Sequence, residues 1–434
     1  MREQSQRKKR FQSKEKRLVV NARASGRRNP IAIYIPALLD VAFQRLSALL
    51  NNSISQARQH YLLRLVPLIA FIVNALIGLY WTVQMKESGL QDLGSFLHSV
   101  AAYREGLNPY GFYSWLRPAP ISAEALNLNP PISVYLFRPL LAVDTSVAHV
   151  GFLLGSIAIL GASFAWLFSE NPDKRNPRVL LVILSLAGIW HTLGYSQIYG
   201  PLLLLAVGAW YFMRRDQLLL AGIAIGLIAA MKPNFLLWPL LLLLSGHTRT
   251  SLVAMLVTAT VSAIPLLAEG PTIYRQWLDL TMTFGGVEWT SNASLVAVGS
   301  RLGSPELGVL LGGGIVVGLA WHLWRTRPDI ATASALSIAV VLLASPASWA
   351  GYTLFLLPAL FSLRWDRTTW IVLLLLATPF WLVGYSPDSG PILYVLIGST
   401  YAWATLLLLA LLLRNDAEGS VEAEQGPQAL AVAS

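Results

Sequence analysis

Cysteine is absent from the 434 residues of this sequence, which excludes disulfide bonds and thiolate metal sites. Charge is scarce as well: Asp, Glu, Lys and Arg make up 12% of the chain, about half of the roughly 25% that soluble domains carry. The six histidines are scattered and lack the spacing of metal ligands, so we expect no metal site. No apolar stretch with a small-residue cleavage site follows the basic N-terminus, and we therefore expect no cleavable signal peptide.

Long hydrophobic runs dominate the sequence instead. Hydrophobic residues make up 55% of the chain, and the mean hydropathy is +0.56. The runs approach the length of about 20 residues that a helix needs to cross a bilayer, which predicts an all-α integral membrane protein with about 12 transmembrane helices. A shorter run, Pro131–Val143, is predicted to be re-entrant or interfacial. The long runs lie near residues 65–83, 146–169, 178–196, 198–213, 217–231, 233–246, 250–268, 306–325, 329–347, 350–364, 368–386 and 391–413.

Positive charge between the runs predicts their orientation. Cytosolic loops of membrane proteins carry an excess of Lys and Arg. With about 12 crossings and a cytosolic N-terminus, every basic cluster between the runs falls on the cytosolic side, and both termini are cytosolic. We therefore expect a multi-pass protein of the plasma (inner) membrane. The clusters are Lys174, Arg175 and Arg178; Arg214 and Arg215; Arg249; Arg325 and Arg327; Arg364 and Arg367; and Arg414.

The net charge of +10 is concentrated at the N-terminus. The first 29 residues hold eleven Lys or Arg and two Glu. Beside a membrane, such a tail predicts a cytosolic anchor on anionic lipids. Because no aromatic or folded module accompanies it, we expect no nucleic-acid partner. The predicted organisation is a disordered basic tail (1–30), an amphipathic juxtamembrane segment (31–64), a membrane domain (65–413) and a disordered cytosolic tail (414–434).

A polar segment that glycine and proline interrupt, Gln91–Tyr113, follows the first run and is predicted to lie outside the membrane. Gly106 is well placed to end a helix there, and Asn108-Pro109 favours an extended exit. Asp92 stands at the predicted helix start, where it can serve as an N-cap or as a general base. The apolar positions of this helix follow the i, i+3, i+4, i+7 pattern of an interfacial helix that faces lipid or the bundle: Leu93, Phe96, Leu97 and Val100.

The remaining polar motifs fall on the same predicted outer face, so we expect a single extracytoplasmic active or binding surface. With Asp92, these motifs are Asn108-Pro109-Tyr110, Gly194–Gln197, Lys232-Pro233-Asn234, Ser291–Leu295 and Ser345–Trp349. A set of motifs along the chain resembles, in the same order, those of glycosyltransferase family 87, over roughly residues 65–410: Asp92, Tyr103–Tyr110, Asn129–Ile132, Tyr195–Ile198, Ala221–Pro233, Asn292–Leu295 with Arg301, and Ser345–Trp349. Members of that family are GT-C-type transferases that use polyprenyl-phosphate sugars, and the best known are mannosyltransferases.

The resemblance implies a GT-C-type bundle with interfacial or re-entrant helices in its first extracytoplasmic loop. It also implies a hexosyl, first of all mannosyl, transfer from a polyprenyl-phosphate sugar to a lipid-linked or glycan acceptor, without a cofactor. Asp92 would be the general base, with Glu288 and Asp279 as reserve bases. Lys232 or Arg138 would hold the donor phosphate. The residues that would contact substrate are Asn108, Tyr110, Gln197, Asn292, Ser294, Arg301 and Trp349.

Three departures from the family pattern leave the sugar open. Ser196 replaces the glycine before Gln197, and Asn129 stands where an aromatic is usual. After Trp349 the family commonly carries histidine, whereas this chain has Ala350-Gly351-Tyr352. A sugar other than mannose is therefore a second expectation.

A lipid or glycan transporter or flippase is the alternative function, because such proteins also have many spans. Transporters usually show internal repeats and polar residues near the middle of the bilayer. We find no repeat, and the charged residues stand at the ends of the predicted spans. The transferase is therefore favoured, while an oligosaccharide ligase of similar architecture stays open.

Overall fold

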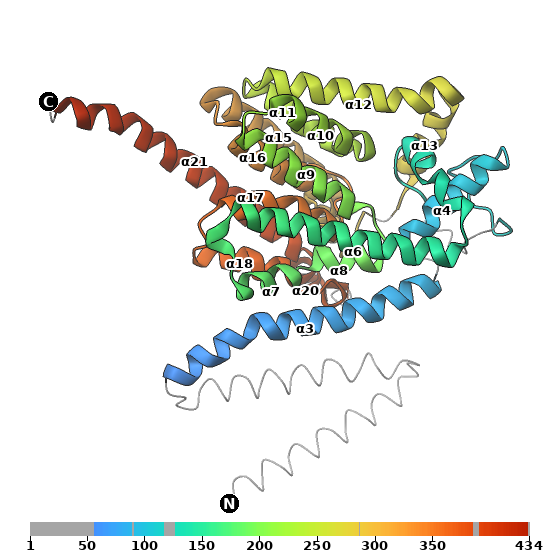
Figure 1. Cartoon of the computed structure of the whole chain (residues 1–434), viewed down its shortest axis with the longest axis horizontal. Coiled ribbons are helices and arrows are strands. Elements are labelled where there is room, and N and C mark those ends of the chain that lie inside the picture. Colours follow the sequence, from blue (N-terminus) through green and yellow to red (C-terminus); the bar gives the residue numbers. More distant parts are fainter. Residues whose placement is uncertain (1–55, 89–90, 117–125, 286, 385–389, 433–434) are drawn as a thin grey trace, which may run out of the picture. The chain divides into compact units, whose positions relative to one another are not determined.

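The computed structural model describes residues 56–88, 91–116, 126–285, 287–384 and 390–432, and these are helical apart from loops and one isolated bridge (Figure 1). The basic tail, and the predicted juxtamembrane segment up to residue 55, lie outside the described residues. By its contacts the chain divides into two units, Met1–Val66 and Pro67–Ser434. The second unit contains nearly all of the described residues.

Three described helices are long and apolar enough to cross a membrane: α6 (Thr145–Glu170), α12 (Thr248–Glu269) and α15 (Pro305–Thr326). Two bent pairs raise the number of candidate spans in the described residues to five. These pairs are α7 (Pro177–Leu184) with α8 (Ala187–Gly194), bent by 47°, and α20 (Pro391–Gly398) with the first part of α21 (Thr400–Val432), bent by 52°. The chain is therefore a multi-pass membrane protein.

The other predicted runs also fall on helices, most of them shorter than a full span. They are α3 (Gln56–Ser88), α9 (Tyr199–Arg214), α10 (Leu218–Met231), η3 (Pro233–Leu236) with α11 (Leu237–Leu244), α16 (Ile330–Ala344), η4 (Ala350–Leu356) with α17 (Leu357–Ser362), and α18 (Arg367–Leu376) with α19 (Phe380–Gly384). The segment Pro131–Val143 forms two short pieces, α5 (Ile132–Phe137) and η1 (Arg138–Ala142).

Helix α10 is packed tightly between α9 and α12. A Cβ added at Gly222 would lie 2.7 Å from the carbonyl oxygen of Thr250, and one at Gly226 would lie 2.6 Å from that of Ala254. The Thr258 hydroxyl donates a hydrogen bond of 3.1 Å to the Gly226 carbonyl across this contact. Small residues on one face let two membrane helices approach closely and hydrogen-bond to each other. This contact fixes the position of the C-terminal end of α10.

Helix α4 (Asp92–Arg104) follows α3 and forms where the sequence predicts it. It ends in a Schellman motif, because the Leu107 N–H donates to the Ala102 carbonyl and Gly106, at φ 69°, donates to Tyr103. The four apolar positions named in the sequence are at most 1% exposed, so this helix packs into the protein.

Two helices and one extension were not predicted. Helix α13 (Thr272–Thr283) and helix α14 (Leu295–Arg301) lie in the loop between α12 and α15. The Ser294 hydroxyl accepts a hydrogen bond of 3.1 Å from the Ala297 N–H and so caps α14. Helix α21 continues through residues 414–432, where the sequence suggested a disordered tail.

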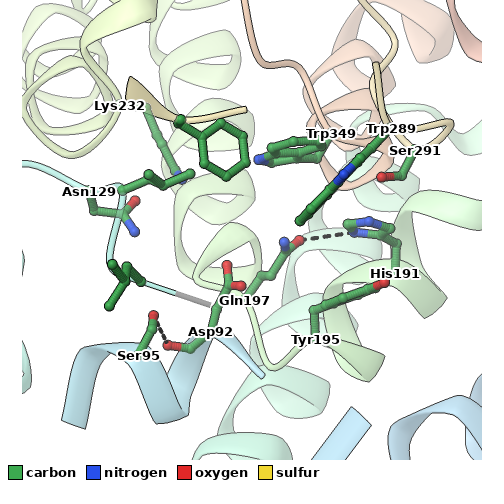
Figure 2. Close-up of a pocket in the computed structure, with 13 residues that line it drawn as sticks. Asp92, Ser95, Asn129, His191, Tyr195, Gln197, Lys232, Trp289, Ser291 and Trp349 are labelled. Carbon is green, nitrogen blue, oxygen red and sulfur yellow. Dashed lines mark hydrogen bonds between the residues drawn. The ribbon is translucent and has the colours of Figure 1, made fainter. Parts of the chain in front are cut away.

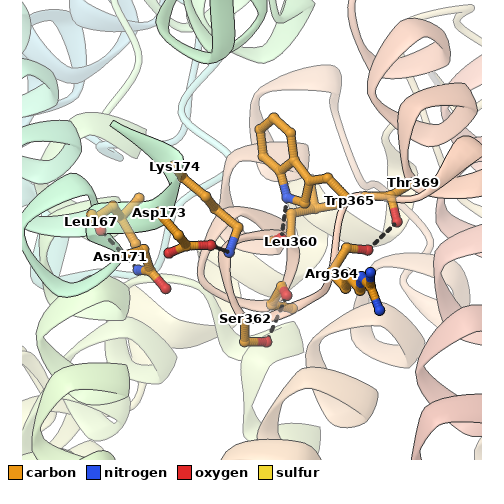
Figure 3. A network of polar contacts seen from close by, with 10 residues as sticks. Leu167, Asn171, Asp173, Lys174, Leu360, Ser362, Arg364, Trp365 and Thr369 are labelled. Atoms are coloured by element: carbon orange, nitrogen blue, oxygen red, sulfur yellow. Dashed lines mark hydrogen bonds and ion pairs between the residues drawn. The ribbon is translucent and has the colours of Figure 1, made fainter. Parts of the chain in front are cut away.

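Figure 3 shows the loop after α6, with Lys174, and the loop after α17, with Arg364, at one end of the helices. Arg215, after α9, forms an ion pair of 2.9 Å with Glu170 at the end of α6. The Phe168 ring of α6 contacts the Phe361 ring of α17 at 5.2 Å, which places the loops after these two helices near each other. Because α9 runs from Tyr199 to Arg214, its N-terminal end, next to Gln197, lies at the opposite end of the helices.

Candidate active site

A cavity of about 300 Å³ lies at this opposite end, where the beginning of α4 and the ends of α8, α10 and α16 come together (Figure 2). Loops between α12 and α14 and before α5 complete its wall. Asp92 is the one carboxylate among the described residues in this wall. The lining residues are Asp92, Ser95, Leu126, Leu128, Asn129, His191, Tyr195, Gln197, Lys232, Phe284, Trp289, Ser291 and Trp349.

Asp92 is the first residue of α4, and its side chain does not cap that helix. Gln91 holds the N-cap position and makes no side-chain capping bond; its amide donates instead to the Thr82 and Gly194 carbonyls, both at 3.2 Å. The Asp92 N–H donates to the Tyr195 carbonyl at 2.8 Å and so joins α4 to the end of α8. The carboxylate is left to face the cavity.

The environment of Asp92 makes its carboxyl a weaker acid than usual. Burial raises the pKa of Asp92 from 3.8 to about 6, against the charge of Lys232 and a hydrogen bond from Gln197, which both lower it. Figure 2 shows Asp92 between Lys232 on one side and Gln197 with His191 on the other. A carboxyl with this pKa is mostly deprotonated at neutral pH and can accept a proton there.

Lys232 ends α10 and points its ammonium group into the same cavity. The following Pro233 begins η3 and interrupts the helix here. The Lys232 Nζ lies 3.5 Å from the Tyr199 hydroxyl, 4.9 Å from the centre of the Tyr199 ring and 5.3 Å from that of Tyr352. Cation–π attraction to two rings holds the ammonium without neutralising it. Among the described residues no carboxylate forms an ion pair with Lys232, so its charge is available to an anionic ligand.

The absence of a side chain at Gly351 leaves room for this arrangement of rings. Gly351 lies in the segment after Trp349, where the family commonly carries histidine. A Cβ at this position would lie 2.4 Å from Cδ2 of Tyr199 and 2.9 Å from Oε1 of Gln197. Any larger residue would therefore displace the Tyr199 ring or the Gln197 amide. The neighbouring Tyr352 ring lies 4.7 Å from Tyr199, so the two tyrosines form one surface beneath Lys232.

His191 orients Gln197. Its Nδ1 lies 3.1 Å from Oε1 of Gln197, and its ring stacks on Tyr195 with 4.6 Å between the centres. With its oxygen bound to histidine, the Gln197 amide presents its NH₂ group to Asp92. This role of His191 was not predicted from the sequence, in which it is one of six scattered histidines. The sequence does contain one signal for it. His191 and Tyr195 are four residues apart, and this spacing places two side chains on the same face of a helix.

Ser196, which replaces the glycine of the family pattern, has a positive φ of 48°. Residues other than glycine rarely adopt this left-handed conformation, which costs roughly 1–2 kcal/mol. The turn at Ser196 reverses the chain between α8 and α9 and sends Gln197 into the cavity. The structure thus gives a backbone reason for glycine at this position.

Three residues that were predicted to contact substrate lie behind the cavity wall and hold it together. They are Asn292, Ser294 and Arg301. Asn292 accepts hydrogen bonds from the N–H groups of Ser294 (3.1 Å) and Ser348 (2.9 Å). Arg301 donates to the carbonyls of Trp289 (2.7 Å) and Asn292 (2.8 Å). These bonds position Trp289 and Trp349, whose rings lie 5.8 Å apart in the wall.

Asn108 and Tyr110 also support the wall. Asn108 accepts a hydrogen bond from the Tyr110 N–H at 2.9 Å, and the buried Tyr110 hydroxyl donates to the Asn129 carbonyl at 3.1 Å. Asn129 itself lines the cavity, and its Oδ1 is buried without a partner among the described residues. Its side chain therefore offers an acceptor to a ligand.

The other predicted charged residues lie elsewhere. Arg138 and Asp279 are exposed and do not line the cavity. Glu288 is exposed and lines a second cavity next to the first. No group of three or more His, Cys, Asp or Glu side chains that could hold a metal ion occurs in the part of the chain that the structure describes.

Comparison with known proteins identifies the family. The model of glycosyltransferase family 87 matches residues 127–346, which is 220 of the 434 residues. The chain is also similar to the crystal structure of ArnT from Cupriavidus metallidurans bound to undecaprenyl phosphate, at 15% identity and a TM-score of 0.37, over 83% of this chain and 80% of that one. For the apo state of ArnT the identity is 15%, the TM-score 0.36 and the coverage 83% and 79%. No curated protein matches the chain. Because the family match spans half of its length, this protein belongs to glycosyltransferase family 87 and is a membrane glycosyltransferase.

Proposed function

We propose that this glycosyltransferase moves a hexosyl group, mannosyl in the first instance, from a polyprenyl-phosphate sugar to a lipid-linked or glycan acceptor. The observation that supports this best is the presence of Asp92 and Lys232 in one small cavity, without a direct ion pair between them. A base and a separate cation are what this reaction needs. Membership of a glycosyltransferase family favours the transferase over a transporter or flippase.

Asp92 would act as the general base. As the acceptor oxygen attacks the anomeric carbon, its proton passes to the Asp92 carboxylate, and the bond from that carbon to the polyprenyl phosphate oxygen breaks. The bonding electrons leave with the phosphate. Asp92 is the one carboxylate among the described residues that line the cavity, so no second carboxylate is available as a nucleophile. A single displacement with inversion at the anomeric carbon is therefore proposed.

Lys232 would hold the donor phosphate. Positive charge that is fixed in place before the reaction stabilises the developing negative charge of the leaving group. The rings of Tyr199 and Tyr352 fix the ammonium in this way. On the same side, the unpartnered Oδ1 of Asn129 would accept a hydrogen bond from a hydroxyl of the donor sugar. Because the family usually has an aromatic residue at this position, Asn129 is where the choice of sugar would differ.

We also propose the GT-C arrangement, with about 12 crossings, both termini in the cytosol and the cavity on the extracytoplasmic face. The arginine-bearing loops at the other end of α9 support this orientation. The membrane domain would comprise residues 65–413, and the basic tail (1–30) would bind anionic lipids of the inner membrane.

Substitution of Asp92 by asparagine tests the proposal. The full chain would be assayed in membranes with radiolabelled polyprenyl-phosphate mannose and its glucose counterpart. Asp92→Asn keeps the size of the side chain and removes the base, so turnover should fall by about 10²–10⁴-fold. The matched control is Asp279→Asn, the same change at an exposed residue outside the cavity, which should keep full activity. Normal turnover by Asp92→Asn would refute the assignment of the base.

A further inference from the structure

A second cavity, of about 430 Å³, adjoins the first. The two share Tyr195, Trp289 and Ser291 in their walls. The second cavity is completed by Trp81 near the end of α3, by Trp381 in α19 and by Glu288 in the loop before α14. Asp92 and Lys232, proposed above for catalysis, are not among its described lining residues, whereas Glu288, which the sequence offered as a reserve base, is.

The lining of the second cavity combines indole rings with one carboxylate. Trp81, Trp289 and Trp381 provide flat apolar faces, while Glu288 provides the charge. The Tyr394 hydroxyl donates a hydrogen bond of 3.2 Å to the Glu288 carbonyl and so fixes this part of the loop. The Trp381 Nε1 is buried and has no acceptor among the described residues, so it is an unused donor in this wall.

This chemistry suits a neutral carbohydrate better than a lipid phosphate. The apolar C–H face of a sugar packs on an indole ring, and its hydroxyls exchange hydrogen bonds with a carboxylate and an indole N–H. No Lys, Arg or His is among the described residues that line this cavity, and the Glu288 carboxylate would repel a phosphate. A polyprenyl tail would leave both Glu288 and the Trp381 N–H without partners.

The position of the second cavity fits the same assignment. In Figure 2 the shared residues Tyr195, Trp289 and Ser291 lie on the side of Asp92 that faces away from Lys232. A sugar in the second cavity would therefore present a hydroxyl to Asp92 from the side opposite the donor phosphate, as a displacement with inversion requires. We infer that the second cavity is the acceptor subsite, and that it binds a neutral sugar residue of the acceptor through its tryptophans and Glu288. The inference rests on the proposed function.

The test measures sugar binding apart from turnover. The full-length protein in detergent would be titrated with methyl mannoside, methyl glucoside, methyl galactoside and methyl arabinofuranoside, with binding followed by saturation-transfer NMR. At least one glycoside should bind. Glu288→Gln keeps the shape but removes the charge and exchanges one acceptor oxygen for a donor, and Trp381→Phe removes the indole N–H with part of the ring, so each should weaken binding by up to roughly tenfold. Trp321→Phe, at a tryptophan that is 57% exposed on α15, is the matched control and should bind normally.

The outcomes separate this inference from the proposed function. Asp92→Asn should still bind the glycoside although its turnover falls by about 10²–10⁴-fold, since the asparagine oxygen can accept the same hydroxyl and Asp92 does not line the second cavity. An Asp92→Asn variant with normal turnover would refute Asp92 as the base, and it would not affect the inference that the second cavity binds a glycoside. The subsite is overturned if no glycoside binds. It is equally overturned if Glu288→Gln and Trp381→Phe, once thermal melting has shown that both are folded, bind the glycoside as the parent does. It is also overturned if these variants weaken the binding of undecaprenyl phosphate instead.

Discussion

At the scale of single residues, the proposed role of Asp92 as general base would couple activity to pH. A general base must be deprotonated, and burial raises the pKa of Asp92 to about 6. We therefore expect kcat/KM to fall as the pH drops through about 6, tenfold for each further pH unit. A pH–rate profile between pH 4.5 and 8 measures this. If kcat/KM instead falls only near pH 4, where an ordinary carboxyl titrates, the result would contradict the buried environment of Asp92.

The same pKa has a consequence for stability. Because the folded pKa of Asp92 lies above its value of 3.8 in the unfolded chain, the folded state binds more protons between these two pH values. The contribution of Asp92 to stability thus decreases as the pH rises from about 4 to 6, by at most roughly 1.4 kcal/mol for each pH unit. The carboxylate is kept at a cost to the fold, as is common for active-site groups.

Lys232 and Gly351 give a second prediction at this scale. Lys232→Ala should raise the dissociation constant of undecaprenyl phosphate at least tenfold, and Lys232→Arg should keep part of the binding because the charge remains. Gly351→Ala should have a similar effect without touching the ligand, because the added Cβ displaces Tyr199 from beneath the ammonium. The measurement is binding of the lipid by each purified variant.

Gly313→Ala, on α15 with open space for a Cβ, is the control for Gly351→Ala and should leave lipid binding unchanged. Undiminished binding by Lys232→Ala would show that Lys232 only fills the end of α10.

Sequence reasoning grouped several residues that line the cavity, but it did not separate them from residues that lie behind the cavity wall. Asp92, Gln197, Lys232 and Trp349 line one cavity, because polar groups at the ends of apolar runs had few other places to lie. Arg301 is different: it was assigned to substrate, and its guanidinium donates to backbone carbonyls of the wall. Whether a polar side chain faces a cavity or the chain behind it depends on contacts between distant segments, which a single sequence does not contain.

At the scale of elements, the loop between α13 and α14 is the part of the site that Arg301 holds. Arg301→Ala would leave the buried carbonyl of Asn292 without its donor, and it would remove one of the two donors to the Trp289 carbonyl, which keeps the Asn292 N–H. The loss at Asn292 costs about 1–3 kcal/mol. We expect a clear drop in thermal stability together with lost activity, and no rescue at high donor concentration.

Arg275→Ala, at an exposed arginine of α13, is the control and should melt as the parent does. A stable Arg301→Ala variant with a raised KM would instead assign Arg301 to substrate.

The apolar runs predicted helices well because a chain in hydrocarbon must satisfy its backbone hydrogen bonds internally. Their breaks were not predicted. The run 178–196 reads as one span, yet it bends by 47° between α7 and α8. Ser185 donates its hydroxyl to the Val182 carbonyl at this bend, and no proline marks it. Helices α13 and α14 were missed because their stretches are short and only partly apolar.

At the scale of the whole molecule, the proposed orientation is open to a direct test. A reporter that is active outside the cytosol should be active when fused after Ser114, in the loop that follows α4, and silent when fused after Arg215. The physical reason is the excess of Lys and Arg in the loops predicted to be cytosolic, which include Arg215 after α9. A reporter that is active only in the cytosol supplies the control and should give the opposite pattern. Activity outside the cytosol after Arg215 would reverse the sidedness and, with it, the face on which the sugar is transferred.

The shortness of the helices around the cavity affects how deep the reaction takes place. Helices α9, α10 and α16 have 16, 14 and 15 residues, which makes them about 21–24 Å long at 1.5 Å per residue. A typical hydrocarbon layer is about 30 Å thick. In the proposed orientation, with their basic ends at the cytosolic surface, these helices would stop several ångströms short of the outer surface. This hydrophobic mismatch would either thin the bilayer locally or place Lys232 below the level of the lipid headgroups. In both cases a polyprenyl phosphate could reach the ammonium by a short vertical displacement, while its tail stays in the membrane.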